Sequence, residues 1–97
     1  MHVAAQEFDL RLPDCGSLKA KRSVVRHLLD TARRRFGVAA SEVGHQDLHQ
    51  RAALGFAAVA PSAGRVEEVL DRVDRLVWSD PRVIVLSSTR HWLDQDL

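Results

Sequence analysis

The feature that most constrains the fold of this chain is a change of hydrophobic period along it. Between Val3 and Leu12, apolar and polar residues alternate with a period of two, which is the pattern of a half-buried strand. From Ser17 to Phe36, apolar residues instead recur every three or four positions, as they do on one face of a helix. Pro13–Gly16 separates the two segments, and Gly37 is a residue type that commonly ends a helix. A strand followed by an amphipathic helix is therefore predicted for the first third of the chain.

The rest of the chain contains further segments with the periodicity of strands and of a helix. The further elements predicted are strands over 38–43 and 52–60, a helix from Pro61 to Asp80, and a last strand from Val83 to Leu86 that extends towards Trp92. Right-handed crossovers place both helices on one face of a four-stranded antiparallel sheet. The prediction is one domain over residues 1–97, an α/β (α+β) ferredoxin-like sandwich with the order βαββαβ.

Several observations limit the class of protein. The chain has 97 residues and one cysteine, Cys15, so an intramolecular disulfide framework is excluded. No apolar run approaches the roughly 20 residues that a membrane-spanning helix needs. We therefore expect a cytoplasmic protein that does not associate with membranes.

Charge is concentrated in the first helix. The whole chain has 14 basic and 13 acidic residues. Within 17–36, however, Asp30 is the one acid, and the basic residues are Lys19, Lys21, Arg22, Arg26, Arg33, Arg34 and Arg35. At the helical rotation per residue, several of them fall in a sector of about 60°. A concentration of like charge indicates a polyanionic partner, whereas a solvated exterior is the alternative interpretation. The residues predicted to bind a nucleic acid or another anion are Ser17, Lys19, Lys21, Arg22, Arg26 and Arg33.

Lys21 differs from its neighbours because it falls within the apolar sector of the helix. Two interpretations are open. Its ammonium could join the free N–H groups at the helix start in binding a phosphate, or it could pair with Glu42 or Asp47 in a structural network.

The segment His45–His49 has the spacing H-x-D-x-H, which suits a metal site if the segment is an extended strand. We instead expect His45 and Asp47 to hold a turn through hydrogen bonds from their side chains to the backbone. No serine or cysteine is placed nearby as a nucleophile, and the glycines form no phosphate-binding loop. No metal, cofactor or catalytic residue is predicted, and the protein is not expected to be an enzyme.

The sheet face opposite the helices has no covering element in the chain. Val3, Ala5, Val83 and Val85 are predicted to contribute to this open face, and all are apolar. Such a face is usually buried by a second copy or a partner, so a homodimer is expected. A partly solvated face with small residues is the alternative.

The segments M-H-V-A, S-L-K-A-K-R and V-G-H-Q-D-L-H-Q-R-A, in this order, resemble domain of unknown function 503, the YlxP-like family of small bacterial proteins. The resemblance covers essentially the whole chain. It implies a ferredoxin-like fold and a cytoplasmic protein without established enzymatic activity. It also implies genes near those for transcription elongation, translation initiation and ribosome-binding factors. Gln6 and His49 depart from the family pattern, which usually has an apolar residue and a tryptophan there.

The leading hypothesis is therefore a noncatalytic accessory protein that associates with RNA or the ribosome through its basic first helix. The alternative is a homodimeric module for protein interaction or small-ligand regulation, which would use the open sheet face.

Overall fold

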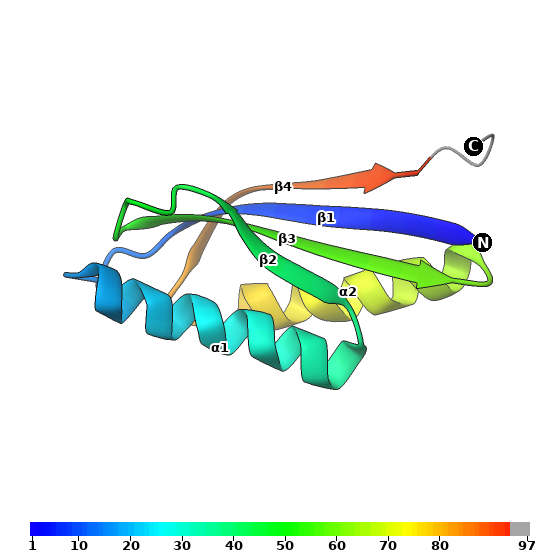
Figure 1. Ribbon diagram of the computed structural model, residues 1–97, viewed down its shortest axis with the longest axis horizontal. Coiled ribbons are helices and arrows are strands. Elements are labelled where there is room, and N and C mark those ends of the chain that lie inside the picture. The colour runs from blue at the N-terminus through cyan, green and yellow to red at the C-terminus, as the bar shows by residue number, and fades with distance from the viewer. Residues whose placement is uncertain (94–97) are drawn as a thin grey trace.

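The order of strands and helices is the predicted βαββαβ (Figure 1). A computed structural model of the chain describes residues 1–93. The elements are β1 (His2–Arg11), α1 (Leu18–Phe36), β2 (Ala39–Gly44), β3 (Arg51–Ala60), α2 (Ala63–Ser79) and β4 (Ile84–Trp92). The prediction of a four-stranded antiparallel sheet with two helices, the ferredoxin-like α+β fold, is confirmed.

The strands are arranged in the order β2-β3-β1-β4, so β1 and β3 form the centre of the sheet. They pair along their full length, from His2 opposite Ala60 to Arg11 opposite Arg51. Both helices lie on the same face of this sheet (Figure 1). The core lies between the two layers, where the rings of Phe8 and Phe56 meet edge to face with centroids 5.8 Å apart.

The helix ends follow from local capping chemistry. Ser17 and Ser62 have extended backbones, and their hydroxyl oxygens accept hydrogen bonds from the N–H groups at the third position beyond. Each cap satisfies a backbone donor that the helix leaves free. At the other end of α1, Gly37 adopts a left-handed conformation with φ 67°, and its N–H donates to the Arg33 carbonyl at 3.1 Å.

The second helix ends at Asp80, whose N–H donates to the Val77 carbonyl. The Arg82 guanidinium donates to both carboxylate oxygens of Asp80, at 2.9 and 2.6 Å. These hydrogen bonds hold the pKa of Asp80 below its usual value. These hydrogen bonds between Arg82 and Asp80 hold the turn that follows α2 and leads into β4.

The prediction that Val83 and Val85 lie on the open face is wrong. Val83 belongs to the buried core, and Val85 packs against that core because it pairs with the inward-facing Leu10. The register between β1 and β4 then shifts, so that Ser87 pairs with Asp9 and lies on the open face. This β-bulge, which the sequence pattern does not reveal, exchanges the faces of odd and even residues along β4.

Gln6 lies among the buried residues of β1. Its amide N–H₂ donates to Ser88 Oγ, and its carbonyl oxygen accepts from Arg90 Nε at 2.6 Å. Arg90 also donates to Asp71 of α2 at 3.1 Å. The buried amide therefore has partners for both of its ends, as a polar group in a core requires.

Among residues 1–93, no helix is long and apolar enough to span a membrane.

The left-handed backbone at Gly37 generates a test of helix capping. Gly37→Ala is expected to lower the free energy of unfolding by about 1 kcal/mol, because a Cβ is disfavoured at positive φ. Gly64→Ala is the matched control, since Gly64 lies inside α2 without positive φ and with open space around its Cβ position. It should leave stability unchanged or raise it by up to about 1 kcal/mol. Urea denaturation of both variants measures the difference, and equal stabilities would contradict this account of the cap.

Candidate nucleic-acid interface

The outer face of α1 carries exposed cations around a shallow hollow. The residues that line it are Lys19, Arg22, Ser23, Arg26, His27, Asp30 and Arg34. They recur at intervals of three and four, which places them on one side of the helix. This side is directed away from the sheet, because the buried residues of α1 lie on its opposite side. Lys19, Arg22 and Arg26 of the predicted anion-binding set are thus brought together on an accessible surface.

The cations of this hollow have no acidic partner. Within the described part of the chain, the side chains of Lys19, Arg22, Arg26 and Arg34 form no hydrogen bond or ion pair. By contrast, Arg72 on the exposed side of α2 donates to Glu68 at 3.0 Å, as the i,i+4 spacing predicts. We therefore define the basic face as Lys19, Arg22, Arg26 and Arg34, none of which forms an ion pair with Asp30 or another described acid.

Ser17 and Arg33 are placed near the basic face, but both have structural partners. The hydroxyl oxygen of Ser17 accepts the Ala20 N–H at 3.1 Å as the helix cap. Arg33 donates to Asp30 at 2.9 Å and to the Ala40 carbonyl of β2 at 2.5 Å. Arg33 therefore ties α1 to the sheet, and its remaining capacity for an anion is smaller than that of the four unpaired cations.

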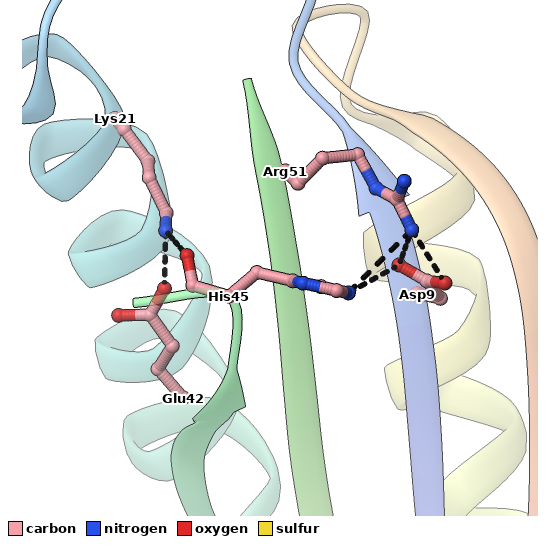
Figure 2. A network of polar contacts seen from close by, with 5 residues as sticks. All are labelled: Asp9, Lys21, Glu42, His45 and Arg51. Carbon is pink, nitrogen blue, oxygen red and sulfur yellow. Dashed lines mark hydrogen bonds and ion pairs between the residues drawn. The ribbon is translucent and has the colours of Figure 1, made fainter. Parts of the chain in front are cut away.

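Lys21 is buried, with 1% of its side chain exposed. Its Nζ lies 2.7 Å from Glu42 Oε2 and donates to the His45 carbonyl at 2.6 Å (Figure 2). Of the two interpretations left open by the sequence, the structure shows the internal network, with Glu42 rather than Asp47 as its acid. Lys21 thus does not belong to the accessible basic face, because both partners enclose its ammonium.

His45 and Asp47 lie in the turns that join β2 to β3, so the H-x-D-x-H segment is not an extended strand. His45 has φ 58°, and its carbonyl accepts the Leu48 N–H at 3.1 Å as well as the Lys21 ammonium. The backbone of His45, rather than its side chain, therefore holds the turn. Asp47 is exposed, and its carboxylate has no hydrogen bond to any residue in 1–93.

The imidazole of His45 instead reaches the open sheet face. Its Nε2 lies 3.5 Å from Asp9 Oδ1 and 3.5 Å from Arg51 Nη2, and Arg51 Nη2 donates to both Asp9 oxygens at 2.9 and 2.8 Å (Figure 2). Asp9 and Arg51 were not predicted as site residues. Strand pairing brings them together from distant parts of the sequence, and alternation reveals only that Asp9 is on the polar side of β1.

This charged cluster changes the character of the open face. A small hollow beside it is lined by Glu7, Asp9, His45, Ala53, Ser87 and Thr89. Carboxylates and hydroxyls thus occupy a surface where an apolar patch was expected. Across residues 1–93, no group of three or more His, Cys, Asp or Glu side chains could hold a metal ion.

A second hollow lies where α1 meets α2. It is lined by Arg35, Phe36, Arg72, Arg75, Leu76 and Ser79. Asp71 of α2 forms an ion pair with Arg90 of β4 rather than with Arg75, four residues further along the helix. Arg75 is consequently left without an acidic partner among the described residues. Cations of α1 and α2 therefore meet around this hollow.

These features define a small ferredoxin-like protein whose helical layer is cationic and whose open sheet face bears carboxylates. The chain belongs to the family described as "Protein of unknown function (DUF503)", which matches residues 3–90. The uncharacterized protein YlxP of Bacillus subtilis (strain 168) is 38% identical over 90 residues, which cover 93% of this chain and 98% of that protein.

Among solved structures, a REP-associated tyrosine transposase bound to a REP hairpin has a TM-score of 0.45 and 13% sequence identity. The match covers 96% of this chain and 56% of the transposase chain. A similarity of this size carries no argument about function.

The buried ammonium generates a test that separates structural from binding roles within α1. Lys21→Ala is expected to lower the free energy of unfolding by about 3 kcal/mol, because it leaves Glu42 without its partner. Lys19→Ala removes the same charge from the exposed side of the same helix and should change stability by less than about 0.5 kcal/mol. Chemical denaturation measures both values.

A further variant identifies the cause of the expected loss. Replacing Lys21 by Met and Glu42 by Leu together removes both charges and retains much of the volume, so it should recover most of the stability lost in Lys21→Ala. Similar stabilities for Lys21→Ala and Lys19→Ala would show that the ion pair does not stabilise the fold.

Proposed function

We propose that this protein is a noncatalytic cytoplasmic accessory protein that binds RNA, free or within the ribosome, through the basic face of α1. The observation that carries the proposal is the set of four unpaired cations around one accessible hollow. Each phosphate contact of such a cation releases a condensed counterion, which favours association with a polyanion. If this surface needed charge for solubility alone, side chains paired with one another, as Glu68 and Arg72 are, would serve equally well.

The expected recognition is of RNA backbone and shape rather than of base sequence. Phe8 and Phe56, the aromatic residues of the central strands, are buried between the sheet and the helices. They are therefore not available as the stacking platform that sequence-reading RNA-binding sheets use. Cations on a helix contact phosphates, which position a partner without reading its sequence.

The second candidate function is a homodimeric protein-interaction or small-ligand regulatory module that uses the open sheet face. The exposure of Val43 and Val59, at 54% and 65%, favours it. However, Glu7, Asp9 and Arg51 interrupt the apolar surface, and Val83 and Val85 are directed into the core. We therefore rank this candidate below RNA binding.

Two double variants that each remove two arginines test the role of the basic face. Arg22→Ala/Arg26→Ala should weaken binding to purified ribosomes and to poly-uridine RNA. The slope of log affinity against log salt should become shallower by about two units, because two phosphate contacts are lost. Arg11→Ala/Arg65→Ala removes two exposed arginines that lie outside the hollow. This control alters net charge by the same amount as the first double variant. It should retain the affinity and slope of the parent protein, because both of its residues lie outside the basic face.

Filter binding or fluorescence anisotropy across a salt series gives the affinities, and the melting temperature of each variant reports its folding. If both double variants weakened binding equally, the interaction would depend on net charge rather than on the basic face. If neither weakened it, the proposal of RNA binding through α1 would be rejected.

A further inference from the structure

Strand β4 forms one edge of the sheet. A β-bulge interrupts it after Val85, but beyond that bulge most of the residue types that usually prevent an edge from pairing are absent. Residues 84–93 contain no proline, lysine or carboxylate. Arg90, the one arginine there, is directed inward to Gln6 and Asp71. Leu86 and Trp92 are 48% and 42% exposed. We infer that β4 pairs antiparallel with β4 of a second copy of this chain.

The direction of the free backbone groups follows from the β1–β4 ladder. Leu93 N–H donates to the Val3 carbonyl at 2.9 Å, so the backbone of Leu93 is directed towards β1. Backbone direction alternates along a strand, so residues 91, 89 and 87 also face β1. The N–H and C=O groups of Ser88, Arg90 and Trp92 are therefore directed away from β1, towards the open side of the strand. Together they provide donors and acceptors for another strand.

The opposite edge of the sheet, β2, is protected by α1. The Arg33 guanidinium donates to the Ala40 carbonyl of this edge strand. The Lys21 ammonium holds Glu42 of β2 and the turn that follows it. A β-bulge between Glu42 and Gly44 also interrupts the strand. Among residues 1–93, no helix side chain binds the backbone of β4, which is exposed along most of its length, although a β-bulge after Val85 interrupts this strand as well. The two edges differ, and β4 is the one left available.

Charge and register favour a second copy as the occupant. In an antiparallel pair with Thr89 on the two-fold axis, Ser88 of one chain lies opposite Arg90 of the other, so their outward backbone groups can hydrogen-bond. This register places Thr89 beside Thr89, a favourable cross-strand pair, and opposes no like charges. It also brings Leu86 near Trp92 of the other copy, which covers two of the exposed apolar side chains of the strand.

The resulting dimer has one continuous sheet, because the two-fold axis that relates antiparallel edge strands is normal to the sheet. Because both helices of one copy lie on the same face of its sheet (Figure 1), all helices of both copies then lie on one face of the combined sheet. The inference does not depend on RNA binding, and it assigns the dimer contact to the strand edge rather than to the open face.

A proline substitution with a matched control tests the contact. Ser88→Pro removes the outward N–H without removing a donor to β1, whereas Ser88→Ala retains that N–H and loses the same hydroxyl contact to Gln6. We expect the parent protein and Ser88→Ala to dimerise in sedimentation equilibrium at high micromolar concentration. Ser88→Pro should raise the dimer dissociation constant at least about tenfold, because a two-fold contact loses two hydrogen bonds.

A second pair of variants keeps the inference testable if Ser88→Pro does not fold. Thr89→Lys and Thr89→Glu should each be monomeric alone, since like charges then oppose one another at the axis, and an equal mixture should form a heterodimer. Val59→Lys, on the open face of β3, should leave the dimer intact.

Three outcomes would overturn the inference. These are a parent protein that stays monomeric, a Ser88→Pro dimer as tight as that of Ser88→Ala, and dissociation by Val59→Lys but not by Ser88→Pro. The last of these would assign the dimer to the open sheet face.

Discussion

The burial of the Lys21 ammonium is the constraint on which the orientation of α1 depends. A charge in a protein interior needs both a counterion and hydrogen-bond partners, and Glu42 and the His45 carbonyl supply them from the sheet edge and the following turn. Because side chains follow one another at fixed angles around a helix, burying Lys21 directs Lys19, Arg22 and Arg26 to the opposite, solvent-exposed side. One ion pair thus fixes the rotation of the helix and the direction in which its basic face points.

His45 connects the two faces of the sheet. Its carbonyl accepts the ammonium on the helical side, while its imidazole lies beside Asp9 and Arg51 on the open side (Figure 2). The left-handed backbone of His45 permits this division, because it turns the chain sharply after β2. Unpaired cations therefore lie over α1, whereas Asp9 on the open face is paired with Arg51. A polyanion approaching such a molecule would be oriented towards the helices before contact.

Much of the fold could be predicted because hydrophobic period is a local signal. The alternation in β1 and the helical repeats in 17–36 and 63–79 depend on neighbouring residues, and the structure has elements close to those positions. The burial of Lys21 could also be foreseen from its position within the apolar sector of its helix. Its choice of Glu42 could not, because Glu42 and Asp47 are both acids near the predicted sheet edge and the turn geometry decides between them.

The parts that sequence reasoning missed depend on long-range register. The β-bulge opposite Asp9 and Leu10 reverses which residues of β4 face the helices, and no local motif marks it. The cluster of Asp9, His45 and Arg51 likewise requires the pairing of β1 with β3 to be known first. Prediction of the open face failed for Val83 and Val85 for this reason, since an error of one residue in register exchanges the two faces of a strand.

The two edges of the sheet differ in how they are covered by the helices. The ion pair that orients α1 also places this helix against β2, where Arg33 and Lys21 bind the backbone and side chains of the edge. The other edge receives no equivalent, because α2 packs mainly under β3 and β1 and uses Asp71 to hold Arg90 inward. Turning Arg90 inward satisfies Gln6 in the core, and these contacts leave the backbone edge of β4 uncovered among residues 1–93.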